Sequence, residues 1–165
     1  MQSETKIRRV EREDSAVVAK ILYDSFAEFE VLYTHDGFAA TTLTAERVLA
    51  RMEEGPVWLA LREAEALGTV AAVVKEDSVY IRGMAVHPAA RGLGVGARLL
   101  EVVEDWAVGQ GVMRVFLSTT PFLHAAIRLY ESHGFERTRT DAQDLFGTPL
   151  FTMEKKIPRR QSSIP

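Results

Sequence analysis

The chain has 165 residues, 47% of them apolar, which is enough for one substantial core and suits a single domain. Its 20 basic and 23 acidic residues give a formal net charge of -3, which disfavours nucleic acid as a partner. The absence of cysteine excludes disulfide bonds, thiolate metal ligands and a cysteine nucleophile, and we assign no metal-binding residues. The sequence shows neither a signal core nor a run of about 20 apolar residues, so we expect a cytoplasmic protein that does not enter a membrane.

The first part of the chain predicts a strand followed by helices. Residues 7–10 form a short strand candidate, and Asp14 begins an amphipathic helix whose apolar residues recur at helical spacing. Periodicity is lost over residues 31–42, which predicts a loop or a broken helix. Thr44 then caps a second helix that ends near Glu54.

Three apolar, β-branched runs separated by charged turns occupy the middle of the chain. They cover residues 56–61, 67–74 and 79–86. Because the turns between them are short, an antiparallel meander is the simplest arrangement. A glycine-rich segment follows and leads into an amphipathic helix over residues 94–108.

The second half continues with a buried-type strand over residues 112–117. Thr120 and Pro121 open another helix, which Gly134 closes. The last two strands are predicted at residues 135–140 and 150–155, joined by residues 141–149. We therefore predict one domain over residues 1–157, followed by a polar tail, 158–165, without a core of its own. A homodimer in which a second subunit holds this tail is a hypothesis.

The strongest local signal is the segment from Arg91 to Gly96, in which glycines alternate with larger residues. The missing Cβ atoms let a ligand approach the backbone, and the following helix presents unpaired N–H groups and the positive end of its dipole. This arrangement favours phosphate oxygens as the ligand. An ordinary flexible turn is the alternative, although the preceding arginine and the following amphipathic helix argue against it.

Two other phosphate-binding motifs fit this segment less well. The Walker loop requires a lysine and a serine or threonine after its last glycine, whereas Ala97 and Arg98 follow Gly96. The dinucleotide fingerprint is satisfied by Gly92, Gly94 and Ala97. However, five residues separate the preceding strand from the first glycine, and the next strand lacks the expected acidic residue. A nicotinamide-binding enzyme is therefore disfavoured.

Two motifs follow successive strands of this pattern. They read Arg91-x-x-Gly94-x-Gly96 and Ala126-x-x-x-Tyr130-x-x-x-Gly134-Phe135. With both motifs in place, the sequence closely resembles the GNAT superfamily of N-acetyltransferases over nearly its whole length. The resemblance implies an α+β (α/β/α) GNAT fold, in which about four helices flank a mixed sheet of about seven strands. This sheet is expected to splay between its fourth and fifth strands, here residues 79–86 and 112–117.

The resemblance also implies acetyl-CoA as co-substrate. Main-chain N–H groups of the glycine turn would bind the pyrophosphate, Arg91 would add positive charge, and the end of the fourth strand would bond the pantetheine arm. The cofactor-binding residues implied in this way are Met84, Ala85, Val86, Arg91, Gly92, Leu93, Gly94, Val95, Gly96, Ala97, Ala126 and Tyr130.

Tyr130 is predicted to be the general acid that protonates the departing thiolate. Ala126 and Tyr130 share a helix face, so the small alanine leaves room for the cofactor while the hydroxyl points toward its sulfur. A reference pKa near 10 keeps tyrosine protonated at neutral pH. The alternative for Tyr130 is a core aromatic residue, and the family resemblance favours the acid role.

The sequence does not identify a general base. Some family members carry a glutamate on the fourth strand where this chain has Tyr80. Glu76 and Asp77 fit a solvated turn, while His87 and His124 fit structural or surface roles as well as catalytic ones. A chain of water molecules that accepts the amine proton is an equal alternative.

The resemblance further implies that the acceptor, an amine of a small molecule or peptide, enters between the first two helices and the last strand pair. A mixture of aromatic and acidic side chains there suits a cationic amine with an apolar body. The alternative is that the aromatic residues close the core and the acids are solvated. The candidates are Phe29, Glu30, Tyr33, His35, Phe38, Asp144 and Phe146. The competing function is an acyl-CoA-binding sensor or a catalytically silent module.

Overall fold

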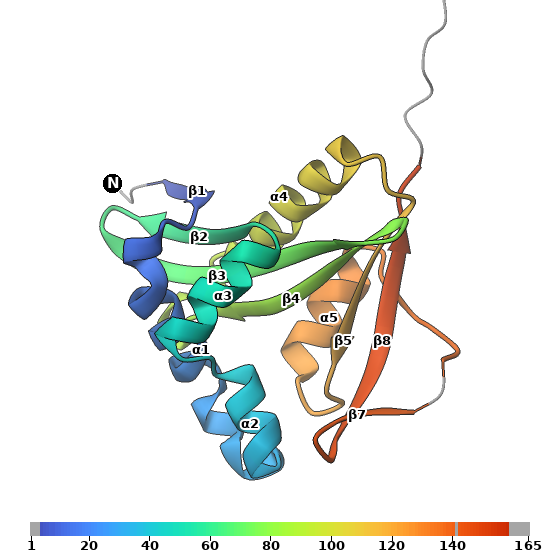
Figure 1. Ribbon diagram of the computed structural model, residues 1–165, viewed down its shortest axis with the longest axis horizontal. Coiled ribbons are helices and arrows are strands. Elements are labelled where there is room, and N and C mark those ends of the chain that lie inside the picture. Colours follow the sequence, from blue (N-terminus) through green and yellow to red (C-terminus); the bar gives the residue numbers. More distant parts are fainter. Residues whose placement is uncertain (1–3, 141, 159–165) are drawn as a thin grey trace, which may run out of the picture.

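The computed structural model describes residues 4–140 and 142–158 (Figure 1). Its strands are β1 Thr5–Arg9, β2 Val57–Arg62, β3 Glu65–Lys75, β4 Ser78–Val86, β5 Arg114–Thr119, β6 Glu136–Arg137, β7 Gln143–Leu145 and β8 Thr148–Lys156. Its α-helices are α1 Ser15–Phe26, α2 His35–Thr41, α3 Ala45–Glu54, α4 Val95–Gly109 and α5 His124–Ser132. Three short 3-10 helices, η1 Arg12–Asp14, η2 Ala27–Leu32 and η3 Pro88–Ala90, connect them. None of the described helices is long and apolar enough to cross a membrane.

A mixed sheet forms the centre of the fold. Its strands lie in the order β1-β2-β3-β4-β5-β8-β6, with β7 paired to β8 beside this path. Neighbouring strands are antiparallel except for β4 and β5, which are parallel. The predicted α+β fold with about seven strands is confirmed, and the additional strand, β7, arises inside the predicted connection 141–149. About four helices were predicted, and the described part of the structure has five α-helices.

The sheet opens between β4 and β5. These strands are paired only from Ser78 and Arg114 to Ile81 and Leu117. Beyond this point β4 continues to Val86 without a partner on its β5 side, and the two ribbons diverge (Figure 1). The predicted splay between the fourth and fifth strands is therefore confirmed.

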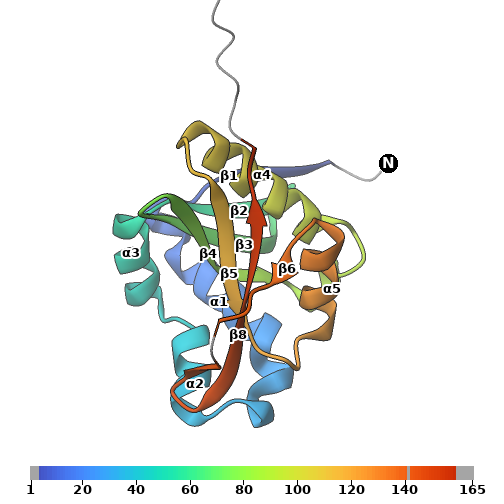
Figure 2. The same ribbon diagram turned by 90° about the vertical axis from the view of Figure 1, so that its right-hand side faces the viewer.

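Helices cover both faces of the sheet. On one face α4 packs on β3 and β4, and its residues Leu99, Leu100 and Val103 are fully buried. On the other face α1 and α3 bury Leu22 and Val48 against the strands. Each fully buried side chain of this size contributes about 1.5 to 3 kcal/mol of transfer free energy. Figure 2 shows α5 and α2 on opposite sides of the β5–β8 part of the sheet.

Two predicted boundaries are wrong for tertiary reasons. The helix expected from Thr120 begins at His124, because residues 120–123 form a turn in which the Phe122 ring packs on Tyr33. The strand expected over 135–140 is reduced to β6, because the chain leaves β8 after Thr138 and the next pairing to β8 is made by β7.

The other predicted elements are present, but two strands are displaced by one or two residues: those expected at 7–10 and 112–117 lie at Thr5–Arg9 and Arg114–Thr119. The segment 31–42 contains the end of η2 and all of α2 with a break between them, which agrees with the predicted broken helix. Of the predicted tail 158–165, only Pro158 belongs to the described residues, so its contact with a second subunit stays a prediction.

Candidate active site

The glycine turn forms an open backbone cradle at the start of α4. Gly92 and Gly94 have φ values of +80° and +78°, and no atom lies within 4 Å of the position that a Cβ would occupy on either residue. Gly94 is the N-cap of α4, and the first helical bond runs from Arg98 N–H to the Gly94 carbonyl, 3.2 Å. The N–H groups of the first turn therefore have no acceptor within the helix and can bind an anion.

Gly96 has a different role from the other two glycines. A Cβ at this position would lie 2.7 Å from Leu129 Cδ2 and 3.4 Å from Met84 Cε, with Val86 also close. The lack of a side chain lets the start of α4 pack against β4 and α5. Three glycines were expected to clear the backbone for a ligand, but only Gly92 and Gly94 face open space.

Arg91 is turned toward α1 and η2. Its guanidinium forms an ion pair with Glu28 and donates a hydrogen bond of 3.4 Å to the Ser25 carbonyl. Arg98, the next cation along the chain, donates to the Thr5 carbonyl. The positive charge predicted for the pyrophosphate is thus adjacent to the turn but paired with a carboxylate.

The end of β4 has one edge on β3 and one edge on the splay. His87 N–H donates to the Leu67 carbonyl of β3, 2.8 Å, and Ala85 pairs with Thr69. Because main-chain groups alternate along an antiparallel strand, the N–H of Val86 points away from β3, toward the splayed side. The Val86 carbonyl accepts a hydrogen bond of 3.0 Å from Ser25 Oγ of α1.

Tyr130 lies on α5 with its side chain inside the protein. The residue is 7% exposed, and burial raises the pKa of its hydroxyl, with a further contribution from Tyr33. Within the described residues its hydroxyl has no hydrogen-bond partner. Gly134, at φ +89°, ends α5 as predicted, and Phe135 N–H bonds the Tyr130 carbonyl at 3.0 Å. Ala126, one turn earlier, is half-buried against the same core.

The acceptor candidates near η2 and α2 form an aromatic cluster. The Tyr33 ring lies 4.9 Å from Phe122 and 5.9 Å from Phe38, and Phe29 lies 6.1 Å from Phe122. Burial raises the pKa of Tyr33. Interactions with the side chains of Thr120 and Thr41 act in the opposite direction but are smaller. Tyr33 and Phe38 are buried, so they build the wall of this region. Two other candidates, Glu30 and His35, are exposed.

The β7–β8 hairpin is bonded directly to the start of α2. Thr34 N–H donates to Thr148 Oγ1 at 2.9 Å, and Thr34 Oγ1 donates to the Phe146 carbonyl at 2.8 Å. Asp144 accepts the Gly147 N–H and so shapes the hairpin turn. The Phe146 side chain is 67% exposed. The structure therefore joins the two regions that the sequence named as acceptor candidates.

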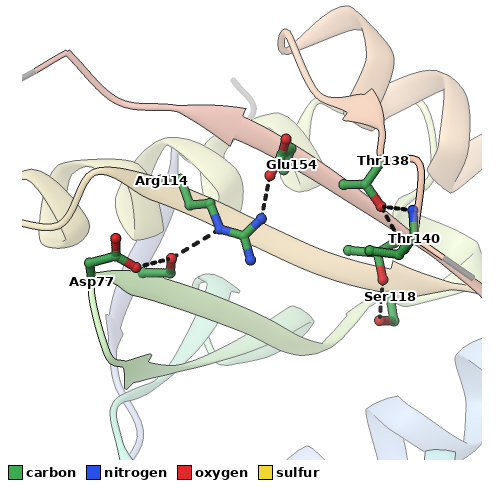
Figure 3. A network of polar contacts seen from close by, with 8 residues as sticks. Asp77, Arg114, Ser118, Thr138, Thr140 and Glu154 are labelled. Carbon is green, nitrogen blue, oxygen red and sulfur yellow. Dashed lines mark hydrogen bonds and ion pairs between the residues drawn. The ribbon is translucent and has the colours of Figure 1, made fainter.

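A polar network crosses β4, β5 and β8 on the face of α1 (Figure 3). Arg114 pairs with Glu154 and donates to Ser78 Oγ at 3.0 Å, and Ser78 donates to Asp77 at 3.1 Å. Tyr80, the residue at the position of the family glutamate, stacks on a phenylalanine of β5. The described carboxylates of this network are all bonded.

The other candidate bases are also accounted for. Glu76 is exposed in the β3–β4 turn at φ +58°, as expected for a solvated turn. His87 Nε2 lies 3.5 Å from an Asp24 carboxylate oxygen, and His124 is exposed.

Comparison with known proteins agrees with this geometry. Residues 19–135, more than half of the chain, match the acetyltransferase (GNAT) family. The protein belongs to this family. Its parallel, diverging β4 and β5 and the glycine turn before α4 are thus parts of a GNAT domain.

The relatives differ in sequence identity and in how much of each chain the match covers. The N-acetylaspartate synthetase of Danio rerio is 38% identical over 82 residues, 48% of this chain, and the match spans only 29% of that protein's length. The uncharacterized N-acetyltransferase YjgM of Escherichia coli (strain K12) is 28% identical over 135 residues, 79% of this chain and 81% of YjgM. The PaiA N-acetyltransferase of Thermoplasma acidophilum, solved in complex with coenzyme A, has a TM-score of 0.80 at 17% identity and covers 93% of this chain and 99% of that chain.

Sequence reasoning missed three residues that shape the GNAT site. Gly83 has a φ of +60° at an irregularity in the β3–β4 pairing, and an isolated glycine within a strand pattern is a known sign of a bulge. Arg51 lies on the inner side of α3, three residues after buried Val48, which is a detectable position. Ser25 bonds β4 from 61 residues away, and no sequence signal indicates this contact.

Proposed function

We propose that this GNAT protein transfers an acetyl group from acetyl-CoA directly to a primary amine, with Tyr130 as the general acid. The observation that carries the proposal is the divergence of β4 and β5 after Ile81 and Leu117. The divergence leaves the end of β4 without a partner on its β5 side, close to the start of α4, where Leu129, the residue before Tyr130, lies beside Gly96. The likeness to a solved relative that holds coenzyme A supports the assignment of the donor.

The residues present fit a pyrophosphate and a pantetheine arm. Gly92 and Gly94 leave open space over the turn, and the free N–H groups of α4 can bind phosphate oxygens. The Val86 N–H points to the splayed side of β4, and in the proposed mechanism it polarises the acyl carbonyl. When bound, acetyl-CoA supplies an acetyl group activated as a thioester.

The proposed chemistry forms a C–N bond and breaks the C–S bond. The attacking amine must be neutral, and we assign its proton to water because Glu154, the carboxylate of the network on β8, is paired with Arg114. Tyr130 gives its proton to the departing thiolate and recovers one from solvent. Burial suits this role because it holds the phenol in its protonated, donating form.

A catalytically silent acyl-CoA sensor is the competing function. The observation that favours it is the aromatic residue Tyr80 at the position of the family glutamate, stacked on Phe116 with ring centroids 5.0 Å apart. A sensor would keep the donor cradle and have no productive acceptor. The two functions therefore differ in whether an amine accelerates release of the coenzyme A thiol.

The test is to incubate the protein with acetyl-CoA and a panel of amines while free thiol is measured. The panel holds peptides, lysine derivatives, polyamines and aminoglycosides. It also holds free amino acids, since the name of one relative specifies an N-acetylated amino acid. Acceptor-dependent thiol release is the expected result. Tight binding of acetyl-CoA by calorimetry without any acceptor-dependent release would support the sensor instead.

A further inference from the structure

A cation lies against β4 where its free edge begins. Arg51 of α3 faces the sheet, and its Nη1 is 2.6 Å from the point that a Cβ would occupy on Gly83. Any larger residue at position 83 would collide with this guanidinium. Gly83 directly precedes Met84, the first residue that we assign to the pantetheine arm. The guanidinium is therefore adjacent to the place where the proposed donor and acceptor meet.

Arg51 lacks a carboxylate partner within the described residues. Glu54, the carboxylate whose charge acts on Arg51, forms its ion pair with Arg82. Glu154, in the network on β5 and β8, is paired with Arg114 (Figure 3). No ion pair or hydrogen bond is formed by the Arg51 side chain in this part of the chain. No ion pair within the described residues neutralises its charge.

The surroundings of Arg51 make this missing partner costly. The cavity beside it is lined mainly by apolar side chains, among them Leu22, Val48 and Val57. Burial, and to a lesser extent Arg82, lower the pKa of Arg51 to about 10, so the residue still carries its charge at neutral pH. Tyr80 and Glu54 favour the charged form of Arg51 but offset the effect of burial only in part. A buried cation without a bonded counterion loses hydration, and an anionic ligand would reduce that cost.

We propose that Arg51 binds the carboxylate of the acceptor, so that the substrate is a free amino acid whose carboxylate lies within a few bonds of the reacting amine. This inference rests on the proposed function. A guanidinium offers a planar pair of N–H donors that matches a carboxylate. A lysine side chain in a protein or a polyamine carries no carboxylate close to its amine and leaves Arg51 unpaired.

The experiment compares each amino acid with its own primary amide as acceptor, using the full chain, acetyl-CoA and thiol release. Rates are divided by the concentration of neutral amine. This correction is needed because the amino group of an amino-acid amide has a lower pKa than that of the free amino acid. For wild type we expect kcat/KM to be about tenfold to a hundredfold higher for the acid, the range for one charge-assisted interaction. Arg51→Gln should remove this preference while changing the amide's kcat/KM by less than about threefold. Arg51→Lys should retain part of it.

Arg47→Gln is the matched control, because Arg47 is an exposed arginine of the same helix, one turn before Arg51. This variant should keep the wild-type preference. Equal wild-type rates for acid and amide would overturn the proposal without any variant, even if Arg51→Gln failed to fold. Equal losses for both acceptors in Arg51→Gln would also overturn it and indicate a structural role. Thiol release with peptides or polyamines but not with free amino acids would overturn the inference and retain the proposed function. If none of the amines in the panel accelerated thiol release, both would be overturned.

Discussion

The proposed donor side and the proposed acceptor side of the candidate site are built by different means. The donor side is made of main-chain groups from one continuous stretch, residues 84–97, which ends β4 and begins α4. The acceptor side is made of side chains, and its bond between Thr34 and Thr148 joins residues 114 positions apart. Local backbone geometry therefore determines the donor side, whereas tertiary contacts create the acceptor side. Single substitutions should therefore be able to impair one side and leave the other unchanged.

The largest effect is expected at Tyr130, the proposed general acid. Tyr130→Phe removes the proton donor and keeps the ring, so kcat should fall about a hundredfold to a thousandfold. The dissociation constant of acetyl-CoA by calorimetry should stay within about threefold of the wild-type value. Tyr23→Phe, at an exposed position on α1, is the control and should leave kcat unchanged. An unaltered kcat in Tyr130→Phe would remove the residue from the mechanism.

A second prediction tests the donor side alone. Gly94→Val places a β-branched side chain at φ +78° over the cradle, and acetyl-CoA affinity should fall about a hundredfold by calorimetry. Gly111→Val, after the end of α4, imposes a similar backbone strain at φ +73°, again with no atom within 4 Å of the Cβ position. Both variants should lose about 1 to 2 kcal/mol of stability in denaturant unfolding. Equal affinities in the two variants would contradict the assignment of the cradle.

A third prediction tests the acceptor side alone. Thr148→Val keeps the shape of a buried residue and removes the acceptor of the Thr34 N–H. The unpaired N–H should cost about 1 to 3 kcal/mol of stability. Because the hairpin then loosens from α2, the KM for the amine should rise about tenfold while acetyl-CoA affinity is unchanged. Thr69→Val, which removes a buried bond to the Trp58 carbonyl, should cost similar stability without changing KM. A KM rise in both variants would show a general effect of stability.

The smallest expected effect concerns pH. Burial raises the pKa of Tyr130 above its ordinary value of 10, so the residue stays protonated as pH rises from 8 to 10. Stability that depends on the neutral phenol is present below pH 10 and is lost as pH rises through the folded-state pKa. The kcat of wild type should therefore show no loss from Tyr130 in this range. The expectation would be contradicted if the kcat of wild type fell between pH 8 and 10 while the residual kcat of Tyr130→Phe did not.

The elements that the sequence predicted well are those with local signals. The helix over 94–108 was predicted within one residue of α4, because its apolar period and its glycine N-cap are both local. Gly134 was correctly predicted to end α5, since its positive φ suits glycine. The start of α5 was predicted too early, because the packing of Phe122 on Tyr33 overrides the helix signals of Thr120 and the proline after it.

The candidate site shows the same division. The cradle at Gly92 and Gly94 could be predicted, since a ligand-facing backbone needs glycine in a positive-φ conformation and the chain order already supplies the helix. The role of Gly96 could not, because its contact with Leu129 exists only once α4 and α5 pack together. Likewise, nothing in the neighbourhood of Arg51 along the chain indicates that its guanidinium lies beside β4 without a carboxylate partner in the described structure.

The amino-acid order was sufficient for the GNAT fold, the position of the open glycine turn before α4 and the choice of Tyr130 as a candidate acid. These features depend on hydrophobic period, glycine and residue spacing, which act over a few residues. Folding decided the acceptor side: which aromatic residues form its wall, which carboxylates are paired, and which cation faces β4 without an ion pair in the described residues. Side chains from α2, α3 and β8 meet there only after distant strands pair, and charges become paired or unpaired only when they are brought together.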